Sequence, residues 1–161
     1  MSENDKSIPK NNYSVSLRNK TSEDYEAALN IYNNAYYDVV VEQFGPWDQE
    51  VQNGFFIEAW EKPEFKMIVS EGAVCGFIVV EDCLDGPFIN EIVIDKEYQG
   101  KGIGSYLIRQ IKESAGEEAK SVRLEVLKNN TKAKKLYVSL GFIGTGESAT
   151  HYKMKWVPRV N

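Results

Sequence analysis

Three glycines at alternate positions, with a lysine among them, form a stretch whose residue types suit phosphate binding. Gly100, Gly102 and Gly104 lie within residues 99–105, and an apolar pattern at helical spacing follows them. Glycine has no Cβ, so a ligand can approach the backbone closely, and the N-terminus of a helix attracts negative charge. The pattern predicts an anion site at the start of a helix, and turn glycines without any ligand are the alternative interpretation.

Two common phosphate-binding patterns do not fit this stretch. The pattern GxxxxGK[ST] is absent from the sequence. The dinucleotide pattern GxGxxG needs a third glycine, but Gly100 and Gly102 lead to Ser105, while Gly102 and Gly104 lead to Leu107. Four predicted strands also precede the glycines, whereas the dinucleotide pattern normally follows the first strand of its fold. A pyrophosphate held by consecutive backbone N–H groups therefore remains as the phosphate interpretation.

The elements that position these residues follow from the hydrophobic pattern. Alternation and turn residues predict strands over residues 13–18, 66–70, 73–80, 88–94 and 121–127, with two more from residue 142 onward and over residues 150–157. Helical spacing predicts helices over residues 25–36, 47–60, from about 102 to 111, and 133–140. The expected order is β-α-α-β-β-β-α-β-α-β-β, a mixed α/β domain over residues 13–161 that follows a flexible tail at residues 1–12.

Composition narrows the class of protein. A chain of 161 residues with a net charge of −5 fits one domain and is a poor candidate for a general nucleic-acid binder. Cys75, Cys83 and His151 form no pattern that supplies the four ligands of a structural zinc site, so no metal is expected. We see no targeting segment and no apolar run of about 20 residues, and therefore expect a cytoplasmic protein without a membrane contact.

Two blocks of the sequence resemble the GNAT superfamily of acyl-CoA N-acyltransferases. The stretch QGKGIG at residues 99–104 is similar to the family's Q/R-x-x-G-x-G/A motif. The second block, LEVLKNN at residues 124–130 followed by Ala133, Leu136, Tyr137 and Leu140-Gly-Phe142, is similar to its "LEV…N…A…LY…GF" segment. The pattern is closest to the branch that acetylates the N-termini of ribosomal proteins. The resemblance implies a central, mostly antiparallel sheet whose fourth and fifth strands splay apart.

The resemblance also implies how acetyl-CoA is bound. The main chain of the fourth strand would pair with the pantetheine arm like an added strand, and the glycine stretch would hold the pyrophosphate. Asn130, Ala133, Lys135 and Tyr137 of the second block complete the expected contacts. The expected contacts before that block are Ile92, Val93, Ile94, Gln99, Gly100, Lys101, Gly102, Ile103, Gly104 and Ser105.

Amine acetylation needs two proton steps, because a protonated amine must lose a proton and the departing thiolate must gain one. Tyr137 matches the family's general acid, and a tyrosine is protonated at neutral pH. Glu125 matches the glutamate that acts as base, through water, in the branch that acetylates protein N-termini. Glu91, on the predicted fourth strand, is a second candidate for the base. Tyr137 and Glu125, with Glu91 in reserve, are therefore the expected catalytic residues.

The sequence does not identify the amine that accepts the acetyl group. A peptide N-terminus, a lysine, a polyamine, an amino acid and an aminoglycoside are all compatible with the two blocks. A non-catalytic acyl-CoA-binding sensor or interaction module on the same fold is the alternative function. Terminal strands often pair between subunits in this family, which leaves a homodimer open as well.

Overall fold

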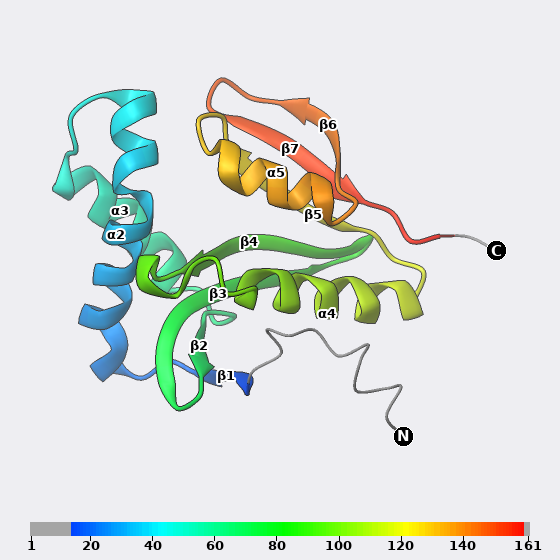
Figure 1. Cartoon of the computed structure of the whole chain (residues 1–161), viewed down its shortest axis with the longest axis horizontal. Coiled ribbons are helices and arrows are strands. Elements are labelled where there is room, and N and C mark those ends of the chain that lie inside the picture. The colour runs from blue at the N-terminus through cyan, green and yellow to red at the C-terminus, as the bar shows by residue number, and fades with distance from the viewer. Residues whose placement is uncertain (1–13, 160–161) are drawn as a thin grey trace.

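The computed structural model describes residues 14–159, so the expected tail at residues 1–12 lies outside the described residues. The predicted order of strands and helices is confirmed, with two short 3-10 turns in addition (Figure 1). The strands are β1 (Val15–Asn19), β2 (Lys66–Ser70), β3 (Ala73–Cys83), β4 (Gly86–Ile94), β5 (Val122–Leu127), β6 (Ile143–Glu147) and β7 (His151–Trp156). The helices are α2 (Tyr25–Phe44), α3 (Gln49–Trp60), α4 (Ile103–Glu117) and α5 (Thr131–Ser139), and the 3-10 turns are η1 (Ser22–Asp24) and η2 (Lys96–Tyr98).

The seven strands form one sheet in the spatial order β1-β2-β3-β4-β5-β7-β6. Every neighbouring pair is antiparallel except β4 and β5, which run parallel. A parallel pair needs a crossover connection, and α4 supplies it. Only Phe88 with Arg123 and Ile89 with Leu124 are paired between β4 and β5, so the two strands separate beyond these residues. The predicted splay between the fourth and fifth strands is confirmed.

Helices cover the two faces of the sheet unequally. On one face, α4 and α5 pack over β5 and β7 in a core that includes Ile108, Leu124, Tyr137 and Met154. On the other face, α2 and α3 cover the N-terminal half of the sheet, where Phe56 lies in a core with strand residues from β2, β3 and β4. The hydrophobic core is therefore divided between a side that carries α4 and α5 and a side that carries α2 and α3.

A capping box begins the 3-10 turn η1, which leads directly into α2. Asp24 takes the position where Glu or Gln is more common, and its carboxylate accepts hydrogen bonds from the Thr21 N–H and from the Arg18 guanidinium. The hydrogen bonds from Arg18 lower the pKa of Asp24 to about 2. Burial acts in the opposite direction, and the bond from Thr21 adds to the lowering. This arrangement fixes the entry of the chain into α2, the helix that later reaches the candidate site.

The sheet is closed at the end where β4 and β5 begin. Gly86 has a φ of +135°, and a Cβ at this position would lie 1.9 Å from the carbonyl oxygen of Ser121, the residue before β5. The Ser121 N–H donates to the carbonyl of Asp85 at 3.2 Å. Only glycine permits so close an approach, which holds the two strands together at one end while they separate at the other. No helix between residues 14 and 159 is long and apolar enough to cross a membrane.

Candidate active site at the opening between β4 and β5

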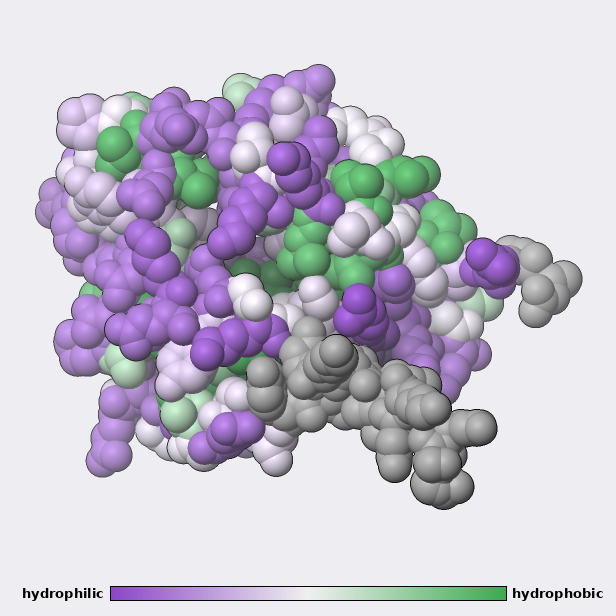
Figure 2. Space-filling view, in the orientation of Figure 1, coloured by the Kyte–Doolittle hydropathy of each residue, from purple (hydrophilic) through white to green (hydrophobic). Residues whose placement is uncertain are grey.

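The backbone of β4 lacks partners on the side that faces β5. After Ile89, the remaining residues of β4 pair with β3 alone, up to Gly76 with Ile94. The expected residues 92–94 lie in this segment, and the side chains of Ile92 and Ile94 pack toward α4. A recess between α2 and α5, with apolar side chains at its floor, lies over this part of β4 (Figure 2). Unpaired strand groups invite an extended ligand that adds as a strand.

The glycine stretch forms the turn that leads into α4. Gly100 and Gly102 have φ values of +79° and +85°, which side-chain-bearing residues rarely adopt, and Gly102 is the N-cap of the helix. The first bond of the helix runs from the Tyr106 N–H to the Gly102 carbonyl, so the N–H groups of residues 103–105 have no partner within the helix. Three free donors at a helix N-terminus suit a phosphate group.

Gln99 has a different role from the rest of that stretch. Its side-chain amide donates to the Ile94 carbonyl at 2.9 Å and so ties the turn to the end of β4. Lys101 is exposed, whereas the side chain of Ile103 is buried. Among the predicted contacts at residues 99–105, Gln99 therefore shapes the turn, the N–H groups of residues 103–105 are free donors, and Lys101 is an exposed cation.

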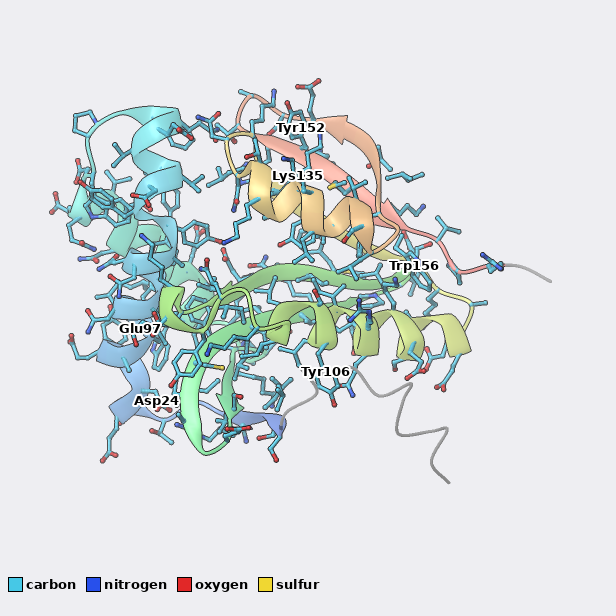
Figure 3. The ribbon with its side chains drawn as sticks, in the orientation of Figure 1. Asp24, Glu97, Tyr106, Lys135, Tyr152 and Trp156 are labelled. Atoms are coloured by element: carbon cyan, nitrogen blue, oxygen red, sulfur yellow. The ribbon has the colours of Figure 1, made fainter. Side chains whose placement is uncertain are left out.

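The N-terminus of α5 lies at the same end of the opening as that of α4 (Figure 1). Asn130 is its N-cap and accepts a hydrogen bond from the Ala133 N–H at 3.2 Å. Lys135 is exposed on α5, and Glu97 lies on the η2 turn across the recess from it (Figure 3). Two helix N-termini thus converge on the open end of the gap between β4 and β5, which favours a ligand with more than one phosphate.

Glu91 reaches the opposite face of the sheet because β4 contains a bulge. Val79 pairs with Glu91 and Val80 with Ile89, so Asn90 has no partner on β3 and the alternation of side chains shifts there. Glu91 then lies on the side that carries α2, where the Tyr36 hydroxyl donates to its Oε1 at 2.8 Å. Burial raises the pKa of the Glu91 carboxyl to about 7, and the Tyr36 bond opposes that shift.

Tyr137 approaches the opening from the side that carries α5. It is buried, and its hydroxyl has no hydrogen-bond partner among residues 14–159. Burial, together with the charge on Glu91, raises the pKa of Tyr137 to about 12. The two groups are therefore close enough to interact electrostatically across the opening, although they come from opposite faces of the sheet.

Glu125 lies apart from this pair. It is exposed on β5, on the face away from Leu124 and Val126, whose side chains are buried against α4 and α5. It has no hydrogen bond or ion pair within the described part of the chain. The structure therefore brings together Tyr137 and the second candidate, Glu91, and leaves Glu125 at the margin of the opening.

Two residues of α2 join the site without a clear signal in the sequence. The sequence predicts Tyr36 in a helix with other aromatic residues, and its hydroxyl contact with Glu91 links positions 55 residues apart. Gln43, seven residues further along the helix, accepts from the Asn129 N–H at 2.9 Å and donates to the Thr150 carbonyl at 3.0 Å. Helix α2 therefore spans the opening, with one contact on β4 and another on the turns that follow β5 and β6.

Comparison with known proteins decides the family. Residues 23–142 match the model of the Acetyltransferase (GNAT) family, which is well over half of the chain. The chain belongs to the GNAT acetyltransferase family. The fold, the opening between β4 and β5 and the two converging helix N-termini agree with that assignment, and the expected family is confirmed. The chain is accordingly an N-acetyltransferase by family, and GNAT acetyltransferases bind CoA and an acceptor.

Relatives and solved structures extend the comparison. A Bacillus subtilis protein named as a ribosomal protein bS18-alanine N-acetyltransferase is 28% identical over 120 residues, which cover 72% of this chain and 78% of the relative. A protein of Bacillus subtilis subsp. natto named as a spermine N(1)-acetyltransferase is 32% identical over 87 residues, 48% of this chain and 57% of the relative. The PaiA N-acetyltransferase of Thermoplasma acidophilum, solved with coenzyme A, has the same fold with a TM-score of 0.71, 17% identity and coverage of 89% and 99%.

Proposed function

We propose that this acetyltransferase transfers the acetyl group of acetyl-CoA directly to a primary amine in a ternary complex, with Glu91 as general base and Tyr137 as general acid. The observation that carries the proposal is the position of Glu91. Its carboxyl is held by Tyr36 beside the opening of the sheet, and burial brings its pKa to about 7. A base is most effective when its pKa lies near the working pH.

The residues that would bind acetyl-CoA fit its chemistry. The free N–H groups of residues 103–105 and the N-terminus of α5 would hold the phosphates, and exposed Lys101 and Lys135 would add positive charge. The unpaired backbone of residues 92–94 would bond the pantetheine arm as an added strand. This arrangement directs the thioester toward the space between Glu91 and Tyr137.

In the reaction, the amine nitrogen bonds to the thioester carbon, the carbon–sulfur bond breaks, and one proton passes from the amine to the base while another reaches the thiolate. Glu91 would take the amine proton, directly or through water. Tyr137 would donate to the thiolate, since its raised pKa keeps it protonated at neutral pH. Once Glu91 is neutral, the charge that raises the pKa of Tyr137 is gone, so the first proton transfer makes the second easier.

The same geometry favours Glu91 over Glu125 as the general base. Glu125 is exposed, so its side chain does not help to exclude water from the reacting atoms. Glu91 is half-buried, hydrogen-bonded and electrostatically coupled to Tyr137. We therefore infer that the residue first expected as a reserve is the base, and that Glu125 contacts the acceptor or the water around it.

The proposal is tested by thiol release from acetyl-CoA in the presence of an amine panel that contains a peptide N-terminus, a lysine side chain, spermine and an aminoglycoside. The named activities of the two relatives, on a protein alanine and on spermine, give two members of that panel. We expect amine-dependent release, and mass spectrometry of the product should show a gain of one acetyl group. Binding of CoA without release on any amine would instead support a non-catalytic acyl-CoA-binding module.

A further inference from the structure

One face of the C-terminal half of the sheet carries no helix. Leu124, Val126 and Met154 point to α4 and α5 and are buried. Paired residues in antiparallel strands share a face, so the alternate positions of β5 and β7 point to the opposite side. The bare face, as we call it, consists of Arg123, Glu125, Lys153, Lys155 and Ile143, and each of these is exposed or half-buried.

This bare face continues the surface on which Glu91 lies. Phe88 precedes Ile89 on β4 and points away from α4, as Glu91 does beyond the bulge. The Arg123 guanidinium lies over the Phe88 ring, 5.3 Å from its centroid, and so connects β4 and β5 on that side. If acetyl-CoA occupies the side of α4 and α5, an amine that reaches Glu91 must come from this other side.

The charge of the bare face is opposite to that of the whole protein. The chain has a net charge of −5, yet this face presents three cations and one carboxylate. Arg123, Lys153 and Lys155 form no salt bridge within residues 14–159, although Lys153 is paired in register with Glu125. Three cations without carboxylate partners beside a reaction site favour an anionic substrate and repel a polycation.

We propose that the bare face binds the chain of the acceptor, and that the acceptor is a peptide whose N-terminal amine is followed closely by acidic residues. The inference rests on the proposed function, because it takes Glu91 as the point where the amine reacts. Neighbouring strands lie about 4.8 Å apart, which puts β7 roughly 10 Å from β4 at the end where β4 and β5 still pair, and an extended peptide covers about 3.3 Å per residue. Acidic side chains at about the second to fourth positions would therefore reach Lys153 and Lys155, whereas a small amine would not.

The test compares acetylation of three peptides of equal length that carry glutamate, alanine or lysine at positions two to four, together with spermine and free glutamate. We expect the kcat/KM for the acidic peptide to exceed that for the lysine peptide by about tenfold at low salt. This preference should shrink as ionic strength rises, because screening weakens exposed charge pairs. Free glutamate and spermine should be poor acceptors.

A charge-reversed variant, Lys153→Glu with Lys155→Glu, should invert the order of the acidic and lysine peptides and leave the KM for acetyl-CoA unchanged. Arg109→Glu is the matched control, because Arg109 is exposed on α4 on the other side of the sheet, and it should leave the order as in the wild type. Equal rates on the three peptides, a preference for spermine or free glutamate, or an unchanged order in the double variant would overturn the inference. Failure to acetylate any amine would overturn the proposed function instead.

Discussion

The hydroxyl of Tyr36 on α2 donates a hydrogen bond of 2.8 Å to the carboxylate of Glu91 on β4. This contact does two things at once. It anchors the helix that spans the opening of the sheet, and it stabilises the ionised form of a carboxyl whose burial favours the neutral form. A base with a pKa of about 7 is thus the balance of two opposing effects, and each can be altered separately.

Tyr36→Phe should raise the pKa of Glu91 above about 7, because it removes a donor that stabilises the carboxylate. A hydrogen bond to a charged group contributes about 1.5–3 kcal/mol, so the acidic limb of the kcat/KM profile should move up by about one to two pH units. Tyr37→Phe is the matched control, since Tyr37 is an exposed neighbour on α2 whose ring packs on Trp47. An acidic limb that does not move in Tyr36→Phe would contradict this account of Glu91.

Tyr137→Phe should lower kcat by about 100-fold or more while the protein stays folded, because general acids typically contribute factors of that size. The phenylalanine ring fills the same space, and the lost hydroxyl has no partner within the described residues. The melting temperature should therefore change little. Tyr152→Phe, on β7, is a control whose activity should remain near that of the wild type. Full activity of Tyr137→Phe at every pH would refute the acid role.

Gln43→Ala should release α2 from the turns after β5 and β6, because both polar atoms of this side chain are bonded there. Two hydrogen bonds at about 1 kcal/mol each predict a loss of about 2 kcal/mol in the free energy of unfolding. Amide hydrogen exchange at Asn129 should also become faster. Gln43→Glu keeps the acceptor of the Asn129 bond and should protect that amide better than alanine does. Equal exchange in all three proteins would exclude a bridging role.

Gly86→Ala tests the closed end of the sheet. The new Cβ would lie 1.9 Å from a backbone carbonyl, and the positive φ is strained for alanine, so we expect a loss of at least about 2 kcal/mol in stability. Gly144→Ala is the control, because a Cβ added at that exposed site would have no other atom within 4 Å. Chemical denaturation measures the free energy of unfolding of both variants. Equal stability of the two variants would show that β4 and β5 do not need this contact.

Most of the fold was predictable because its signals are local. Helical spacing of Tyr25, Leu29, Tyr32 and Tyr36 depends only on neighbours in sequence, and the motif blocks located both helix N-termini. By contrast, the features that favour Glu91 over Glu125 as the base are not local in sequence. They are the bulge at Asn90, which changes the face of β4, and the contact with Tyr36, which joins residues 55 positions apart. No pattern in the sequence encodes either feature.

The sequence also did not predict the order of the last strands within the sheet. The hydrophobic pattern predicted two strands after residue 142, but β7 lies between β5 and β6, so the last strand of the chain pairs with β5. That arrangement puts Lys153 and Lys155 beside Arg123 and Glu125. The cations of the bare face are dispersed along the sequence and meet only through strand pairing.

The pH dependence of kcat/KM for the wild type, Glu91→Gln and Glu125→Gln distinguishes the two carboxylates as the general base. A group with a pKa raised to about 7 must lose its proton to act as base, so wild-type activity should rise with pH through about 7. Glu91→Gln should abolish this limb and lower kcat/KM by about 100-fold or more, whereas Glu125→Gln should keep the limb. Retention of the limb and of activity in Glu91→Gln, with their loss in Glu125→Gln, would contradict the account.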